Sequence, residues 1–272
     1  MRSIATCADA RRCARDGDAI PARAPVLGAE AGLRRELALF DRVAAGAIRS
    51  GALFWRSERA IVAPRSAERQ SGFAHAAEAM TRRGWPVVLR STGGDVAPQA
   101  AGILSVAFSF RAEPSPDFGI NAAYRLLCGA LIKALARLGV DACCGKVPGA
   151  LCDGDFNLVV DGRKLAGTAQ RWRRLSGADR GGVAILAEAA ILVDADLATL
   201  VGAANEFYHR SGIPLRIAAE RHVTLAQLLP ALAIEMGVES LINRLAGEIA
   251  AALPQAGSAD ASGGKQWLGA PP

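Results

Sequence analysis

The dipeptide Asp161-Gly162 places a strong constraint on how this chain can fold. It separates two runs that suit β-strands, Phe156 to Val160 and Arg163 to Arg171. Asp-Gly is a favoured two-residue turn because both positions tolerate positive φ, and a turn this short joins antiparallel neighbours. The sequence therefore predicts a β-hairpin, and with it a sheet that is at least partly antiparallel.

Helical and strand patterns alternate along the rest of the chain. Apolar residues at three- and four-residue steps predict helices over 30–49, 73–83, 117–138, 195–210, 224–234 and 239–253. Short apolar runs predict strands over 52–56, 59–63, 86–89, 103–110 and 182–193, with 86–89 and 103–110 as partners. Hairpins beside helices, with few crossover units, predict an α/β fold of the α+β type, in which helices flank a mixed, largely antiparallel sheet.

The two ends of the chain lack these patterns. Residues 1–28 show no sustained periodicity and are predicted to form a flexible N-terminal extension. Residues 29–255 are predicted to form one domain with a helical C-terminal part. Residues 256–272, rich in Gly, Ser, Ala and Pro, are predicted to be a disordered tail.

Composition narrows the class of partner. A formal charge of +6 suits an acidic partner, but an aromatic content of 5% argues against nucleic-acid binding. The longest apolar stretch, around residues 181–204, contains Glu188, Asp194 and Asp196, so no membrane span is expected. Six cysteines in a chain of this length, with no recognisable signal peptide, are typical of the reducing cytoplasm.

Metal binding is not expected from the cysteine pattern. The spacing of Cys143, Cys144 and Cys152 matches no usual zinc pattern, and no histidine lies near them in the sequence.

A first loop carries residue types that suit ligand binding. Thr92-Gly93-Gly94 follows a predicted strand, and consecutive glycines allow positive φ and a close approach of backbone N–H groups to a ligand. Arg90, just before it, could neutralise a carboxylate or phosphate. The alternative interpretation is a tight turn beside a surface charge.

A second loop holds Cys152 among Pro148, Gly149, Asp153, Gly154 and Asp155, twelve residues before Lys164. If this loop folds back over the hairpin, the cysteine and the lysine meet. A nearby ammonium group favours the nucleophilic thiolate form of a cysteine. The alternative is a buried, inert cysteine.

The residues after Lys164 are small. A two-residue period places Lys164, Ala166, Thr168 and Gln170 on one face of the second hairpin strand, with Gly167 and Ala169 on the other. Space beside the ammonium would admit a ligand chain. The alternative is a lysine that extends from a sheet edge into solvent.

Two segments of the chain resemble the biotin/lipoate A/B protein ligase and octanoyltransferase superfamily. The first is Arg90-Ser-Thr-Gly-Gly-Asp95 continuing to Val106, and the second is Gly162-Arg-Lys-Leu-Ala-Gly-Thr168 continuing to Arg171. The resemblance covers about residues 30–210. It implies the catalytic-domain fold of that superfamily, a tunnel for a medium-chain acyl group lined by the Gly-Gly loop, and an active-site lysine at Lys164.

One branch of the superfamily fits better than the other. Ligases activate free lipoate as an adenylate with ATP and Mg²⁺, whereas transferases pass the acyl group through a cysteine thioester. Pro148-Gly-Ala-Leu-Cys152 and the twelve-residue step to Lys164 are similar to the transferase branch, so the resemblance makes Cys152 the nucleophile. It implies octanoyl or lipoyl transfer with no cofactor required, and the substrate-binding residues Arg90, Thr92, Gly93, Gly94, Gly167, Thr168 and Ala169.

The resemblance also implies partners and leaves alternatives. Partners would be acidic lipoyl-carrier domains of the glycine cleavage H protein or of E2 subunits, with acyl carrier protein as a further candidate. Asp95 stands where many members have a third glycine, and Ser105 lies near a usual asparagine. A carboxylate near an adenylate phosphate would be repelled, so Asp95 argues against the ATP-dependent ligase. That ligase and a non-catalytic lipoyl-carrier binding protein stay as alternatives.

Overall fold

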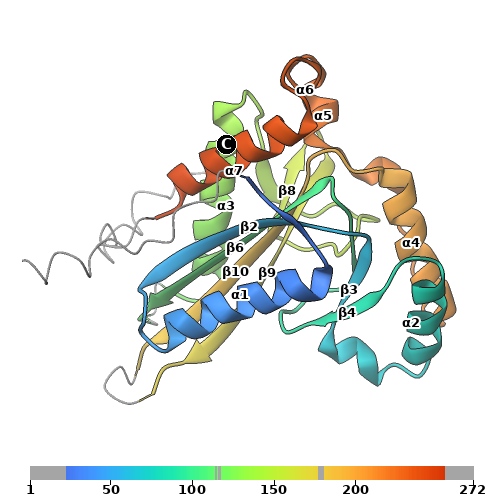
Figure 1. Cartoon of the computed structure of the whole chain (residues 1–272), viewed down its shortest axis with the longest axis horizontal. Helices are drawn as coiled ribbons and strands as arrows, with labels where there is room; N and C mark the ends of the chain where they lie inside the picture. Colours follow the sequence, from blue (N-terminus) through green and yellow to red (C-terminus); the bar gives the residue numbers. More distant parts are fainter. Residues whose placement is uncertain (1–22, 114, 116–117, 177–180, 255–272) are drawn as a thin grey trace, which may run out of the picture.

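The computed structural model describes residues 23–113, 115, 118–176 and 181–254. Its centre is a seven-stranded sheet in the order β1-β2-β6-β10-β9-β8-β7 (Figure 1). The strands are Val26–Leu27 (β1), Ser50–Ser57 (β2), Ile103–Ala112 (β6), Cys143–Gly145 (β7), Asn157–Val160 (β8), Arg163–Arg174 (β9) and Val183–Leu192 (β10). β1 is parallel to β2, and the other neighbours are antiparallel. The prediction of a mixed, largely antiparallel sheet is confirmed.

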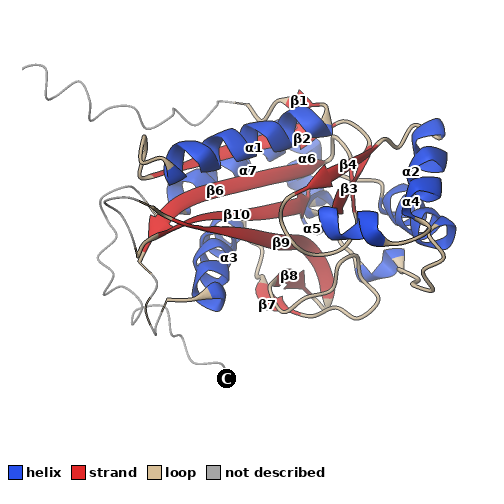
Figure 2. Cartoon of the chain, turned by 90° about the horizontal axis from the view of Figure 1, so that it is seen from below, coloured by secondary structure: helices blue, strands red, loops and turns tan. Residues whose placement is uncertain are grey.

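Helices cover both faces of this sheet because its central strands are apolar on both sides (Figures 1 and 2). α1 (Ala29–Ala44) packs Phe40 and Val43 against Ala107, Ala184 and Leu186. The neighbouring positions of β6 and β10 point the other way and form a larger core with α3 (Ile120–Arg137) and α7 (Val238–Ala252). Strand alternation thus explains why a chain with continuous apolar strands needs a helical layer on each side.

A second, three-stranded sheet has the order β4-β3-β5. Its strands are Ala60–Pro64 (β3), Val87–Arg90 (β4) and Ala97–Gln99 (β5), and β3 is parallel to β4 and antiparallel to β5. The predicted pairing of 86–89 with 103–110 is therefore wrong. The run from Ile103 to Phe110 is buried throughout and lies inside the large sheet, between β2 and β10. Beside the small sheet, η1 (Arg65–Arg69) leads to α2 (Phe73–Arg82), which packs on α4 (Leu197–Arg210).

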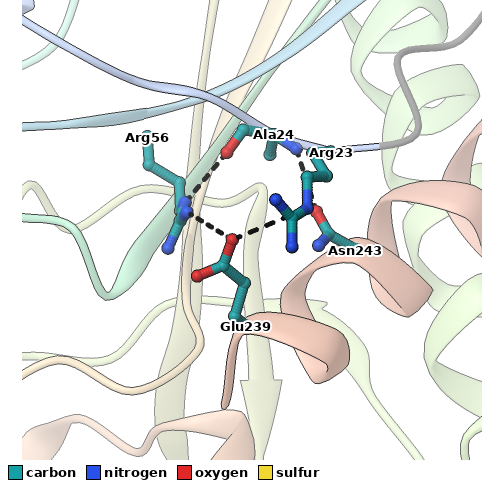
Figure 3. Close-up of polar contacts among 5 residues, drawn as sticks. All are labelled: Arg23, Ala24, Arg56, Glu239 and Asn243. Atoms are coloured by element: carbon teal, nitrogen blue, oxygen red, sulfur yellow. Dashed lines mark hydrogen bonds and ion pairs between the residues drawn. The ribbon is translucent and has the colours of Figure 1, made fainter. Parts of the chain in front are cut away.

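The start of the described chain belongs to the fold. Ala24 is buried, and its backbone N–H donates to Asn243 Oδ1 on α7 at 2.9 Å (Figure 3). Arg56 on β2 donates from Nε to the Ala24 carbonyl at 3.0 Å, and its Nη2 lies 3.6 Å from Glu239 Oε1. The expected N-terminal extension is therefore wrong for residues 23–28, which are tied to a strand and a helix distant in sequence. Residues 1–22 lie outside the described residues.

Two predicted helices end differently. The first stops at Ala44, five residues before the predicted end, because Gly46 adopts φ 80° and Ser50–Ser57 is already a strand. The predicted helix over 224–234 is divided at Pro230 into α5 (Leu225–Leu228) and α6 (Pro230–Met236), with η3 (Ala219–Arg221) shortly before them. Proline begins a helix well but removes an N–H from a helix interior.

Among the described helices, none is both long enough and apolar enough to cross a membrane. The predicted tail, residues 256–272, lies outside the described part of the chain.

Candidate active site

The hairpin that carries Lys164 forms as predicted. Asp161 and Gly162 adopt φ values of 49° and 70°, which is the positive-φ pair that the short turn requires. A β-bulge follows, because Leu158 pairs with Ala166 while Val159 pairs with Lys164. The extra residue interrupts the two-residue alternation at this point. The prediction that Lys164 shares a face with Ala166, Thr168 and Gln170 fails there.

Lys164 turns its amine into the protein. Its residue is 5% exposed, and Nζ donates to the carbonyl oxygens of Leu151 and of Cys152, the latter at 3.0 Å. A Cβ on Gly167 would lie 3.0 Å from Nζ, so the absence of a side chain at Gly167 makes room for the amine. Burial lowers the pKa of Lys164 to about 8, while the charges of Cys152, Asp153 and Asp95 oppose the shift. Lys164 can thus exchange a proton near neutral pH.

The loop before the hairpin presents Cys152 beside this amine. The carboxylate of Asp153 accepts hydrogen bonds from Val147 N at 2.7 Å and from Asn157 Nδ2 at 3.3 Å, which closes the loop on itself. Cys152 adopts φ 46° and its side chain is half-buried. A non-glycine residue in this region costs free energy, and such residues cluster at functional sites. Lys164 and Cys152 are thus neighbours through the carbonyl of Cys152, and the predicted action of the ammonium on the thiol stays a prediction.

The Gly-Gly loop contacts the thiol of Cys152. The backbone N–H of Asp95 donates to Cys152 Sγ at 3.1 Å. Gly94 has φ 96°, and a Cβ there would lie 3.0 Å from both Cys152 Sγ and Arg90 Nη2. Gly94 therefore has to be glycine, whereas Gly93 has no positive φ and no atom close to its Cβ position. Gly94 alone approaches the thiol closely, and the predicted approach of both glycines to a ligand stays a prediction.

Arg90 holds the Gly-Gly loop through hydrogen bonds to its backbone carbonyl groups. Its guanidinium donates to Gly93 O at 2.9 Å, to Asp95 O at 2.6 Å and to Val62 O at 3.0 Å. Most of its N–H groups are thereby used within the protein. Its contact partners make it a loop anchor, and its predicted role toward a substrate anion stays a prediction.

Thr168 and Ala169 lie further along β9. Thr168 Oγ1 donates to the carbonyl of Phe156 at 2.8 Å, so this hydroxyl holds the end of the cysteine loop. Ala169 pairs with Glu188 on β10. Their predicted contact with substrate stays a prediction.

Glu36 and Glu188 form a buried carboxyl pair that contacts the Gly-Gly loop through Thr92. The sequence did not indicate this pair. Trp55 Nε1 donates to Glu36 Oε1 at 2.8 Å, Glu36 is hydrogen-bonded to Glu188, and Thr92 Oγ1 donates to Glu188 Oε2 at 2.8 Å. Burial, and then the charge of Glu188, raise the pKa of Glu36 well above its ordinary value. Burial also raises the pKa of Glu188, while the Thr92 hydrogen bond and the charge of Arg90 lower it. The buried pair therefore favours one shared proton over two charges, and the larger rise at Glu36 favours Glu36 as the donor.

Glu36→Gln is expected to stabilise the protein increasingly as pH rises. The pKa of Glu36 is higher in the folded state than in the unfolded state, so the wild type loses stability from about pH 4.3 upward until the folded pKa is reached. Glutamine keeps the donor to Glu188 and the acceptor for Trp55 without needing a proton. The difference in unfolding free energy should grow by about 1.4 kcal/mol per pH unit in that window.

Urea unfolding followed by circular dichroism between pH 5 and 8 measures this difference. Glu30→Gln is the matched control, because Glu30 lies exposed on the same helix in an ion pair with Arg34. Its effect should stay within about 0.5 kcal/mol at every pH. A pH-independent difference for Glu36→Gln would show that Glu36 is ionised in the folded protein.

His222 is the other site residue that sequence reasoning missed. It lies 2% exposed just after η3, and its Nε2 accepts from Leu151 N at 3.0 Å. No histidine lies near Cys152 in the sequence, but His222 contacts the cysteine loop in the structure. A separate hollow of about 450 Å³, lined by Met80, Arg83, Trp85, Gly202, Ala203 and Glu206, lies between α2 and α4.

These features define an enzyme-like site on an α/β scaffold, in which a buried amine binds the backbone carbonyl of the residue that carries a half-buried thiol. The family model of the lipoyl protein ligase A/B catalytic domain matches residues 29–250, so the chain belongs to that family. The predicted superfamily and its catalytic-domain fold are confirmed.

Two proteins and one solved structure show how similar this chain is to known proteins. An uncharacterised protein of Cupriavidus necator is 37% identical over 183 residues, which are 64% of this chain and 72% of that protein. An octanoyl-[GcvH]:protein N-octanoyltransferase of Kyrpidia tusciae is 36% identical over 54% of this chain and 51% of its own length, so the chain spans about half of that relative. The crystal structure of a lipoate-protein ligase A bound with ATP shares the fold, with a TM-score of 0.57, 18% identity, and coverage of 90% of this chain and 93% of the other.

Proposed function

We propose that this protein is an acyltransferase that moves an octanoyl or lipoyl group through a Cys152 thioester onto a lysine of a lipoyl-carrier domain. The observation that carries the proposal is the convergence of Lys164 Nζ and the Asp95 N–H on Cys152. The name of the Kyrpidia relative supports octanoyl-GcvH as donor and a protein as acceptor. The route requires no cofactor.

In the first half-reaction the Cys152 thiolate attacks the carbonyl carbon of the donor acyl amide. The Asp95 N–H donates to Cys152 Sγ at 3.1 Å, so it lies where it can stabilise negative charge on the attacking sulfur. The carbon–nitrogen bond breaks, the nitrogen leaves with a proton from Lys164, and the acyl group stays on sulfur as a thioester. Burial of Lys164 suits this step because it lowers the free energy needed to release that proton.

In the second half-reaction the amine of the acceptor lysine attacks the thioester carbonyl. The carbon–sulfur bond breaks, the amine proton passes to Lys164, and the thiolate and ammonium are restored. Since each half-reaction moves one proton in opposite directions, a lysine with a pKa of about 8 serves both near neutral pH. The formal charge of +6 would favour the encounter with an acidic carrier domain.

The test is octanoyl transfer from octanoyl-GcvH to an apo E2 lipoyl domain, followed by mass spectrometry of the acceptor. Transfer without ATP supports the proposal. Acceptor labelling only with free octanoate or lipoate, ATP and Mg²⁺ would establish the ligase alternative. Carrier binding with no labelling in either assay would establish the non-catalytic alternative.

Gly167→Ala is expected to slow this transfer by about tenfold or more, because small displacements of a catalytic group are costly. The new methyl group would lie 3.0 Å from Lys164 Nζ and 3.2 Å from its Cε, so the amine has to move from the two carbonyl groups it binds. Single-turnover rates measure the effect. The melting temperature should change by only a few degrees.

Gly247→Ala provides the matched control. Gly247 lies exposed on α7 with open space around its Cβ position, so the same methyl group should leave transfer unchanged and add up to about 1 kcal/mol of stability. Equal rates for the Gly167→Ala variant and wild type would mean that the position of the Lys164 amine does not limit transfer.

A further inference from the structure

His222 lies against the two residues proposed to act on the acyl group. It pairs with Lys164 in an isolated parallel bridge, in which Val223 N donates to the Lys164 carbonyl at 2.9 Å. Its imidazole Nε2 accepts from the backbone N–H of Leu151 at 3.0 Å, and Nδ1 lies 3.0 Å from the carbonyl of Ala218. The ring is buried and reaches the cysteine loop from a segment about seventy residues further along the chain.

These contacts fix the protonation of the ring. A backbone N–H can only donate, so Nε2 is the acceptor, and a carbonyl can only accept, so Nδ1 carries the proton. His222 is therefore neutral with hydrogen on Nδ1. This tautomer is set by its two partners and not by solvent.

Leu151, the residue before Cys152, is consequently held at its N–H and at its carbonyl oxygen. His222 binds the N–H of Leu151, and Lys164 binds its carbonyl oxygen. A further backbone bond, Ala218 N to Gly149 O at 3.0 Å, ties the same segment to the loop. These bonds oppose relaxation of Cys152 from its positive φ and keep Sγ against the Asp95 N–H.

We propose that His222 is a positioning residue for Cys152, and that protonation of its imidazole releases the loop and withdraws Sγ from the Asp95 N–H. An imidazolium has no lone pair at Nε2, so it would direct an N–H at the Leu151 N–H. This inference rests on the proposed function only for the role of Cys152 as nucleophile. It predicts a loss of thiol reactivity in acid beyond the loss that protonation of any cysteine thiol brings.

The surroundings place this transition below neutral pH. Burial, and then the charge of Lys164 on β9, lower the pKa of His222 below its ordinary value of about 6.5, while the carbonyls of Ala218 and Ala219 and the carboxylate of Glu220 oppose the shift. Arg221 precedes His222 in the chain, and Cys152 and Asp153 follow its loop partner Leu151. The loop is thus held at neutral pH and is released as pH falls below that lowered pKa.

The first test is ¹⁵N-histidine NMR of the wild-type protein. The chain has three histidines, His75, His209 and His222, so the spectrum can be assigned with single variants. At pH 7.5 we expect one ring, assigned to His222, in the form protonated at Nδ1 alone. A His222 ring protonated at Nε2, or at both nitrogens, would overturn the inference.

The second test is the rate at which iodoacetamide alkylates Cys152, measured by peptide mass spectrometry from pH 5 to 8.5. His222→Gln keeps an acceptor for Leu151 N–H that does not titrate, and His222→Leu removes it. The wild-type rate divided by the Gln rate should be near one above pH 7 and should fall about tenfold in acid, as expected for loss of one buried hydrogen bond. His222→Leu should react about tenfold more slowly at every pH.

Identical pH profiles in all three proteins would overturn the positioning role. If His222→Leu does not fold, the comparison with His222→Gln and the NMR result decide the matter. Alkylation needs no acyl donor, so this inference can fail while acyl transfer is observed, and it can hold where acyl transfer is not observed.

Discussion

Cys152→Ser is expected to abolish the covalent acyl intermediate and to lower carrier-to-carrier transfer by at least about 10³-fold. A serine hydroxyl is far less ionised than a thiol, and the single N–H of Asp95 that contacts Sγ cannot compensate for that difference. The serine side chain is slightly smaller, so the loop and its contacts should persist. Single-turnover transfer from octanoyl-GcvH measures the loss.

Cys143→Ser is the matched control for this variant. Cys143 is a free thiol exposed on β7, and it pairs with Val159 through the backbone. Its replacement should leave both the transfer rate and the melting temperature unchanged. Transfer by Cys152→Ser at a wild-type rate would exclude a thioester route.

Lys164→Met is expected to lower transfer by roughly 10²- to 10³-fold, the contribution typical of a positioned acid–base group. Methionine occupies a similar volume but has neither the donor to the Leu151 and Cys152 carbonyls nor a proton to transfer. Lys164→Arg should not restore activity, because a guanidinium is larger and even a Cβ on Gly167 would lie only 3.0 Å from the lysine amine.

The pH dependence of Cys152 loading distinguishes a proton-transfer role of Lys164 from a role in packing alone. Loading of Cys152 from the amide donor should decline as pH rises through about 8, because the ammonium form of Lys164 is lost there. Lys164→Met should lack that decline. Lys146→Met is the control, since Lys146 is exposed at the start of the same loop and its amine pairs with the exposed carboxylate of Asp155. A decline near pH 8 that persists in Lys164→Met would assign that titration to another group.

Much of the fold could be predicted because local signals agreed with the tertiary structure. The Asp161-Gly162 turn needs only two residues with positive φ, and the helices over 73–83 and 117–138 follow from apolar spacing. Pairing between distant strands could not be predicted in the same way. The run from Ile103 to Phe110 is apolar on both faces, so its sequence does not say whether it pairs with β4 or lies between β2 and β10.

The site residues also divide into those that local sequence could predict and those that it could not. The prediction that Cys152 and Lys164 meet needed only a loop and a hairpin next to each other in sequence, and the structure brings them together. His222, Glu36 and Glu188 reach the site from distant segments, and no spacing rule connects them to it. Glu36 did carry a signal, since a carboxylate three residues after Leu33 and four before Phe40 lies on the apolar side of its helix. The bulge at Lys164 had no signal, because it depends on the register with β8.

Intact mass spectrometry after mixing the protein with octanoyl-GcvH, without ATP, tests the central claim most directly. We expect a protein carrying one octanoyl group, mapped to Cys152, sensitive to hydroxylamine, absent from Cys152→Ser, and discharged when an apo lipoyl domain is added. An unmodified enzyme that nevertheless transfers the acyl group, or an adduct on a residue other than Cys152, would contradict the account.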